Sequence, residues 1–218
     1  MIFDILFGGF PFHEVLIILA ALALAIVIAI TLHEVSHAYV AFKCGDPSAK
    51  LAGRLSLNPA KHFEPLGLVC FLVAGVGWAK PVPVNPFNYR NFKRGNFFVS
   101  IAGIATNILV AFVCSFVFYL LSPYGNSDNI FLFGLFYLFY FCMIMNLSLA
   151  VFNLLPIPPL DGYNMLVSFT KPNNGFMRAM RENSMIMLMI MVLFGGFIIF
   201  AIRGALESAF LALWGAIL

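Results

Sequence analysis

Charged side chains are scarce in this sequence of 218 residues, where they make up 10% of the total. Soluble domains average about 25%. Hydrophobic residues account for 62%, and the mean hydropathy is +0.99. The apolar runs lack the polar face that a helix needs at a water boundary, which excludes a soluble α/β fold. A net charge of +3 with no clustered basic groove also argues against a nucleic-acid partner. We therefore expect an all-α polytopic membrane protein in contact with the lipid bilayer.

Several features that would indicate other protein classes are also missing. The four cysteines are scattered without C-x-x-C pairing, so they predict apolar core residues rather than a redox motif or a zinc ribbon. There is no repeat of 20 to 50 residues, no low-complexity linker and no polar segment long enough for an appended soluble domain. The amino end lacks the basic region of a cleavable signal, since Asp4 is its only charge. One domain over residues 1–218 is expected.

Long apolar runs predict a bundle of about four to six transmembrane helices. The first run, from about residue 14 to 43, covers about 45 Å as a helix, which exceeds a hydrocarbon core of about 30 Å. A last apolar piece, interrupted by Arg203 and Glu207, reaches residue 218. The predicted spans are residues 14–43, 96–121, 130–153 and 184–202.

Three other stretches predict non-spanning structure. Residues 66–79 are apolar but cover only about 21 Å as a helix, so a re-entrant loop is favoured. Leucines alternate with small or polar residues over residues 49–58, which predicts a short membrane-associated strand or β-hairpin. The prolines of residues 80–86 forbid a helix and favour an extended backbone.

Basic residues gather on one side of this layout. Residues 43–96 hold eight lysines and arginines, residues 171–183 hold three more, and the opposite turn, residues 122–129, holds none. Basic loops face the cytoplasm. The amino end is therefore expected outside and the loop after the first helix inside, and a crossing by residues 66–79 would split the eight charges between the two faces.

One polar motif interrupts the first predicted span: His33-Glu-Val-Ser-His37. Positions i and i+4 share a helix face, so His33 and His37 can bind one metal ion, with Glu34 beside it as a candidate general base. Glu34 is the only charged side chain between Val15 and Ala41. A chance motif would place two imidazoles and a carboxylate in hydrocarbon for no purpose, which is energetically costly.

A tetrahedral zinc site needs a third protein ligand and an open position. Asp161 follows a predicted helix that is broken by three prolines, so its carboxylate can fold back toward the protein interior. His62, in a polar loop, is the alternative third ligand. His13 lies alone at the water boundary and is expected to be solvated. Asn107 and Asn153 lie in apolar spans, where each could either make an interhelical hydrogen bond or grip a substrate backbone.

Five stretches, in this order, resemble the site-2 protease family of intramembrane zinc metalloproteases, in its compact bacterial form without a PDZ or CBS domain. They are His33-Glu-Val-Ser-His37, Leu57-Asn-Pro59, Gly77-Trp-Ala-Lys-Pro-Val-Pro-Val-Asn-Pro86, Ala102-Gly-Ile-Ala-Thr-Asn107 and Asn153-Leu-Leu-Pro-Ile-Pro-Pro-Leu-Asp-Gly162. One departure is Ile104, where the family pattern usually has proline. The resemblance implies that one Zn²⁺ is bound by His33, His37 and Asp161, that Glu34 is the general base, and that Asn107 and Asn153 bind substrate.

The resemblance also implies an activity, which is the hydrolysis of peptide bonds within or near transmembrane segments. Expected substrates are single-pass membrane proteins or signal-peptide remnants, and the expected location is a bacterial inner membrane with the active site reached from the cytoplasm. The catalytic core would cover residues 14–165, followed by C-terminal helices over 184–218. One alternative is a membrane metal transporter that uses the same His/His/Asp cluster as a transit site, although a transporter needs ligands along a path to both faces. Another is a proteolytically inactive adaptor, which the loss of a ligand would signal.

Overall fold

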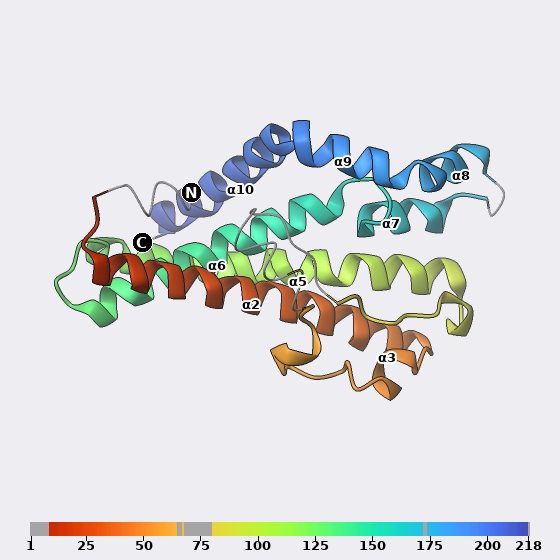
Figure 1. The fold of residues 1–218 in the computed structure, drawn as a ribbon, viewed down its shortest axis with the longest axis horizontal. Helices are drawn as coiled ribbons and strands as arrows, with labels where there is room; N and C mark the ends of the chain where they lie inside the picture. Colours follow the sequence, from red (N-terminus) through yellow and green to blue (C-terminus); the bar gives the residue numbers. More distant parts are fainter. Residues whose placement is uncertain (1–8, 65–66, 68–79, 172–173, 218) are drawn as a thin grey trace.

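The computed structural model describes residues 9–64, 67, 80–171 and 174–217. These residues form an elongated bundle of helices without a β-sheet (Figure 1). Four helices are long and apolar enough to cross a membrane: α2 (Phe12–Cys44), α5 (Phe92–Leu121), α6 (Ile130–Leu154) and α10 (Gly196–Ile217). The all-α membrane fold is confirmed at this level, and so are the first three predicted spans.

Helices α2, α5 and α6 pack against one another and enclose the core. Small residues such as Ala25 of α2 and Ala111 of α5 are fully buried, and they allow the helix backbones to approach closely. Large side chains of α6, including Met143 and Leu147, fill the remaining space and are also fully buried. This three-helix core holds fixed the part of α2 that carries the His-Glu-x-x-His motif.

Shorter helices connect and extend the bundle, and an asparagine precedes several of the helices, both short and long. The Oδ1 atoms of Asn58, Asn85, Asn91, Asn129 and Asn174 accept hydrogen bonds from backbone N–H groups in the first turn of the helix that each residue precedes. The short elements are α3 (Ser48–Leu51), η1 (Pro59–Lys61), η2 (Pro86–Asn88), η3 (Ser122–Tyr124), α7 (Asp161–Phe169), α8 (Gly175–Glu182) and α9 (Ser184–Phe194).

The two ends of the bundle differ in charge. The start of α2, the connection from α5 to α6 and the end of α10 lie at one end, on the left of Figure 1. Helices α3, α7 and α8 and the start of α5 lie at the other end. These segments contain the basic residues Lys50, Lys93, Arg94, Arg178 and Arg181. This arrangement agrees with the layout from which the orientation was predicted, and the orientation itself stays a prediction.

The predicted strand over residues 49–58 is wrong. The chain forms helix α3 there and then turns, with hydrogen bonds from Leu51 N to Pro47 O and from Ala52 N to Ser48 O. The Asp46 carboxylate accepts hydrogen bonds from the backbone N–H and the hydroxyl of Ser48, which favours a helical turn at this point. Leu51 and Leu57 are exposed, so the alternation of leucines does not mark a buried strand face.

The predicted span over residues 184–202 is also wrong in its bounds. Helix α9 ends at Phe194, and a separate helix begins at Gly196 and carries the span to Ile217. Adjacent glycines at 195 and 196 weaken the helix at the break. Arg203 lies within α10, with its guanidinium over the Phe200 ring at 4.7 Å, and Glu207 lies in the same helix. The two charged residues that interrupt the last apolar piece of the sequence therefore lie within one continuous helix.

Two other predictions concern the segment between α3 and α5. The re-entrant loop at residues 66–79 lies outside the described residues except for Gly67. Residues 80–85 contain no helix, and Asn85 has an extended backbone with φ of −119° and ψ of 100°. The prediction for residues 80–86 is therefore confirmed in part: no helix forms over residues 80–85 and Asn85 is extended, but Pro86 begins the 3-10 helix η2 (Pro86–Asn88).

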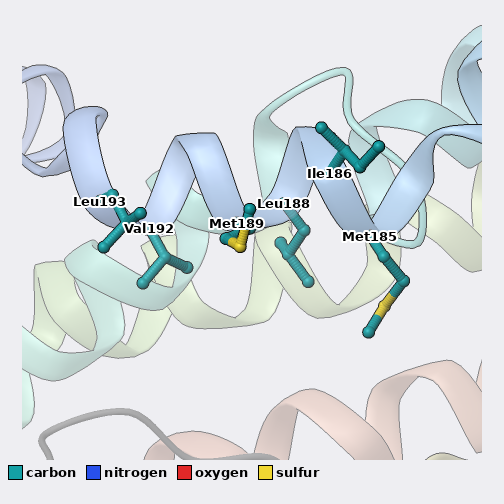
Figure 2. A pocket seen from close by; sticks show the side chains of 6 residues that line it. All are labelled: Met185, Ile186, Leu188, Met189, Val192 and Leu193. Carbon is teal, nitrogen blue, oxygen red and sulfur yellow. The ribbon is translucent and has the colours of Figure 1, made fainter.

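A cavity of about 420 Å³ lies along α9 (Figure 2). Its lining is wholly apolar and consists of the side chains of Met185, Ile186, Leu188, Met189, Val192 and Leu193. None of these side chains can transfer a proton or supply the nitrogen, thiolate or carboxylate ligands of a zinc site, so the chemistry must be sought on α2.

Candidate metal centre

Helix α2 presents two histidines to the interior of the bundle. His33 and His37 are one helical turn apart and both are buried. Their Nε2 atoms lie 3.0 Å from each other. The spacing of the motif therefore places both rings on one face of the helix, as predicted.

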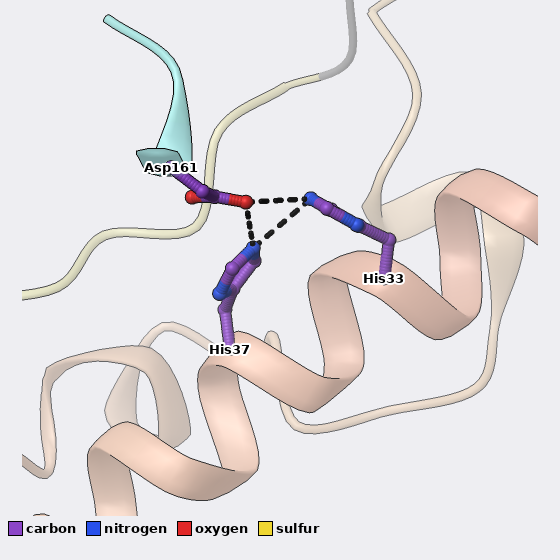
Figure 3. Close-up of side chains that lie close together, drawn as sticks. All are labelled: His33, His37 and Asp161. Carbon is purple, nitrogen blue, oxygen red and sulfur yellow. Dashed lines mark hydrogen bonds and ion pairs between the residues drawn. The ribbon is translucent and has the colours of Figure 1, made fainter. Parts of the chain in front are cut away.

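The carboxylate of Asp161 joins this pair (Figure 3). Helix α6 ends at Leu154, the proline-rich connection follows, and Asp161 is the first residue of α7. Its Oδ2 lies 3.3 Å from His33 Nε2 and 3.2 Å from His37 Nε2. Within the described part of the chain this buried oxygen has no hydrogen-bond donor assigned to it. The structure thus brings together the three side chains that were predicted as metal ligands.

The hydrogen bond at the other ring nitrogen determines which atom of His37 can bind a metal. Nδ1 of His37 lies 2.7 Å from the carbonyl oxygen of Val99 on α5. A carbonyl can only accept, so Nδ1 carries the proton and Nε2 keeps its lone pair. This is the neutral tautomer that a metal-binding histidine needs.

The three facing atoms fit a zinc ion. A tetrahedral site with bonds of about 2.0–2.1 Å has edges of about 3.3 Å between ligand atoms. The observed separations of 3.0, 3.2 and 3.3 Å are close to that value. Lone pairs and a carboxylate held at this distance repel one another unless a cation lies among them. In the described part of the chain, these residues form the one cluster of three or more potential ligands.

The approach of α5 to the two histidine rings depends on Gly103. A Cβ atom at this position would lie 2.5 Å from His33 Cε1 and 2.5 Å from His37 Nε2. The backbone of α5 therefore forms one wall of the metal centre directly, with no side chain between. Any larger residue would push α5 away from α2.

We expect Gly103→Ala to lower zinc affinity about 10- to 100-fold, comparable with the loss of a residue that orients a ligand. The added methyl group would force the rings or the helix to move, and such overpacking typically costs about 1–3 kcal/mol. Zinc competition with a chelator measures the change. Gly204→Ala on α10 is the control, because a Cβ there meets nothing within 4 Å. Unchanged zinc affinity in Gly103→Ala would contradict this account of the close approach.

Glu34 lies next to the cluster and contacts the extended segment. Its side chain is half-buried, and its Oε2 accepts a hydrogen bond of 3.2 Å from the backbone N–H of Val82. A backbone donor holds the carboxylate in one position without supplying a competing charge. This contact holds Glu34, the neighbour of His33 in the sequence, in one position, and its role as general base stays a prediction.

Two buried charged side chains hold the ends of this extended segment. The Arg54 guanidinium donates to the carbonyl oxygens of Lys80 and Pro81, and Arg54 is buried. The Asp46 carboxylate, fully buried, accepts from Asn85 N at 2.6 Å and from Asn88 Nδ2 at 2.8 Å. Burial raises the pKa of Asp46, but these hydrogen bonds outweigh that effect and lower the pKa below 3.8.

Asp46→Asn should lower the free energy of unfolding by about 1–3 kcal/mol, because an amide NH₂ would face a former hydrogen-bond donor. Ser48→Ala removes one of the donors and should have a smaller effect. Since the folded-state pKa of Asp46 is lowered, its contribution is present above pH 3.8 and is lost as the pH falls through the lowered pKa. Thermal unfolding in detergent, from neutral pH to below pH 3.8, measures both the loss of stability on substitution and the loss on acidification. Equal stability of Asp46→Asn and wild type at neutral pH would contradict this role of Asp46.

Three other residues that the sequence analysis considered make their contacts outside the cluster or lie exposed. His62 is fully buried and its Nε2 lies 2.7 Å from the carbonyl oxygen of Ser56, so the structure does not favour it as the third ligand. His13 is exposed at the start of α2. Asn153 is half-buried and donates from Nδ2 to Leu149 O within α6. Its predicted role in substrate binding stays a prediction.

Asn107 is fully buried and lies against His33, with its Oδ1 2.6 Å from Nδ1 of that ring. Asn146 of α6, which the sequence analysis did not single out, is hydrogen-bonded to Asn107. A polar residue inside an apolar helix is the signal that could have identified it. The Val82 amide gave no such signal, because backbone donors leave no trace in side-chain patterns.

Comparison with known proteins supports the same chemistry. The model of peptidase family M50 matches residues 126–197. YwhC of Bacillus subtilis (strain 168), whose name describes a zinc metalloprotease, is 38% identical over 201 residues, covering 90% of this chain and 91% of that protein. MJ0611 of Methanocaldococcus jannaschii, also named as a zinc metalloprotease, is 31% identical over 158 residues, covering 72% of this chain and 74% of the relative. No solved structure matches the chain.

The similarity to YwhC extends over nearly the whole of both chains, so it includes the helices that carry the cluster as well as the segment matched by the family model. The names of both relatives describe zinc metalloproteases, and Zn²⁺ is the metal for which the three ligands are suited. Four long apolar helices make the chain a multi-pass membrane protein. The chain therefore belongs to peptidase family M50, the site-2 protease family of zinc metalloproteases.

Proposed function

We propose that this protein hydrolyses peptide bonds within or near the transmembrane segments of other membrane proteins. In this proposal His33, His37 and Asp161 hold one Zn²⁺ and Glu34 is the general base. The observation that carries it is the position of this cluster on α2, inside a bundle of apolar helices. A protease site at such a place has the membrane-embedded part of a polypeptide as its nearest substrate.

Bound zinc would supply Lewis acidity, lowering the pKa of water from about 15.7 toward 7 and polarising a peptide carbonyl. Glu34 takes the proton that water releases and passes it to the departing amine. The hydrogen bond from Val82 N–H holds Glu34 in position for both transfers. Val99 O holds the His37 ring, so that it presents Nε2 to the metal.

The substrate must unwind locally before hydrolysis, because each amide of a transmembrane helix is hydrogen-bonded within its own turn. We propose single-pass membrane proteins or signal-peptide remnants as substrates. Asn153 is the candidate to hold the unwound backbone. It is half-buried on α6, and its hydrogen bond from Nδ2 to Leu149 O leaves the side-chain oxygen and one N–H for a substrate. In the described part of the chain no other hydrogen bond of the Asn153 side chain is found.

The proposed location is a bacterial inner membrane, with the amino end outside and the active site reached from the cytoplasm. The basic residues near α3, the start of α5 and α8 support this orientation. Cysteines introduced at Lys50 and Lys93 should react with an impermeant reagent only after cells are opened. Labelling of either position in intact cells would contradict the orientation.

A membrane metal transporter is not favoured. The chain belongs to a protease family, and a transport path would need successive ligand sets across the membrane. The described residues contain one such set. Zinc that stays bound while peptide is hydrolysed is the behaviour we expect.

A substrate trap tests the proposed function. The Glu34→Gln protein is expressed in its host in place of the wild type, and membrane peptides from the two strains are compared by mass spectrometry. We expect transmembrane segments to accumulate uncut in the variant and to disappear when wild-type protein is restored. Identical membrane peptides in both strains would contradict intramembrane hydrolysis by this site.

A further inference from the structure

We propose that Asn107 is a positioning residue for His33, and that Asn146 orients it. The two asparagines form a hydrogen-bonded relay across α2, α5 and α6 that selects the tautomer of His33 and directs its Nε2 toward the metal. This inference rests on the proposed assignment of His33 as a zinc ligand. It assigns Asn107 to the metal centre rather than to the substrate, and it gives Asn146 a role.

The relay begins at a backbone carbonyl of α6. Nδ2 of Asn146 donates to the carbonyl oxygen of Cys142 at 2.8 Å. A carbonyl cannot donate, so the amide group of Asn146 has only one orientation, with Oδ1 facing α5. That oxygen accepts a hydrogen bond of 2.7 Å from Nδ2 of Asn107.

A second carbonyl confirms the orientation of Asn107. Its Nδ2 also lies 3.3 Å from the carbonyl oxygen of Ala29 on α2. Both neighbours of Nδ2 are acceptors, so the NH₂ group must face them and Oδ1 must face His33. The 2.6 Å contact between Asn107 Oδ1 and His33 Nδ1 therefore requires a proton on Nδ1. The lone pair of His33 is then on Nε2, which faces Asp161 and His37.

Burial separates this role from substrate binding. Asn107 and Asn146 are both 0% exposed, so neither side chain can reach an unwound substrate without a rearrangement of the bundle. Both N–H donors of Asn107 and its oxygen already have partners inside the protein. A residue that grips a substrate needs a free polar atom at a surface, and the described structure leaves none on Asn107.

The relay also gives His33 a partner of a different kind from that of His37. His37 is held by the backbone of Val99, which no substitution of a side chain can remove. His33 is held by a side chain whose orientation depends on a second side chain. The prediction is therefore specific to His33, and it can be tested by substitution at positions 107 and 146.

The test measures metal binding by purified protein in detergent. Zinc affinity is determined by competition with a chelator, and the visible spectrum of the Co²⁺-substituted protein reports ligand geometry. Asn107→Leu should bind zinc about 10- to 100-fold more weakly and alter the Co²⁺ spectrum. Asn146→Leu frees the Asn107 amide to turn over and should have an intermediate effect.

Ser115→Ala is the matched control, because Ser115 is a fully buried residue of α5 whose hydroxyl accepts a hydrogen bond from Trp214, away from the cluster. It should leave zinc affinity and the Co²⁺ spectrum unchanged. If folded Asn107→Leu has wild-type affinity and spectrum, with only KM raised, the relay is overturned and Asn107 binds substrate. If Asn107→Leu does not fold, Asn146→Leu decides, and wild-type zinc affinity with a wild-type Co²⁺ spectrum in Asn146→Leu overturns the relay.

His33→Ala separates failure of the relay from failure of the proposed function. Loss of zinc in His33→Ala, with full affinity in folded Asn107→Leu, would overturn the relay and leave the ligand assignment intact. Full zinc binding by His33→Ala would overturn the ligand assignment on which both rest.

Discussion

Asp161→Ala should remove zinc from the purified protein and reduce peptide hydrolysis to background. Asp161 Oδ2 is the atom that joins His33 Nε2 and His37 Nε2 into a three-cornered site. Two neutral imidazoles alone would leave a tetrahedral ion with half of its positions unfilled by protein and with its charge uncompensated. Metal analysis after gel filtration should find about one zinc per wild-type chain and far less than that in the variant.

The control for this prediction is Asp128→Ala. Asp128 is exposed in the turn between α5 and α6, at the opposite end of the bundle from α7. Its loss should change neither zinc content nor activity. Full zinc occupancy in Asp161→Ala would mean that another residue completes the site, and His62 would then be substituted next. Loss of zinc with retained hydrolysis would instead separate the metal from the catalytic activity.

The two metal ligands that lie one turn apart on a single helix could be predicted from the sequence. His33 and His37 share a face because α2 is a regular helix, and an apolar run of that length predicts such a helix. Asp161 could be named as a candidate because it follows a predicted helix that is broken by three prolines. Its place among the ligands depends on how the chain turns between α6 and α7, which local pattern does not encode.

Contacts across helices could not be predicted in the same way. The relay through Asn107 and Asn146 depends on how α5 and α6 are rotated about their axes, and apolar helices in a membrane bundle show little periodicity from which to infer that rotation. Gly103 is a similar case, because the need for a missing side chain follows only from the distance between α5 and the histidine rings. Both features depend on how the helices pack against one another, so the sequence of a single helix does not predict them.

The two predictions of the fold that were wrong have local physical causes. Over residues 49–58 the leucines alternate as in a strand, but the buried carboxylate of Asp46 organises Ser48 into a helical turn. At residue 195, hydropathy alone continued a helix through a pair of glycines at which the structure ends one helix and begins another. In both places one or two residues determine the local structure, although the average pattern of the surrounding stretch predicts another one.

Glu34→Gln should lower the rate of hydrolysis about 10²- to 10⁴-fold, the range typical of losing a general base, while zinc content stays at the wild-type level. Gln is nearly isosteric with Glu, and its Oε1 can still accept the hydrogen bond from Val82 N–H. The extended segment should therefore stay in place. A neutral amide cannot take a proton from water, so the loss should be seen in kcat, with little change in KM.

Glu14→Gln is the matched control on the same helix. Glu14 lies in the first turn of α2, away from the cluster, and its substitution should leave kcat at the wild-type value. Wild-type kcat in Glu34→Gln would show that another group accepts the proton. Loss of zinc along with activity would show that Glu34 maintains the metal centre itself. A fall in kcat with zinc and stability retained is the single result that requires proton transfer by Glu34, because metal binding, the Val82 contact and the fold are then all unchanged.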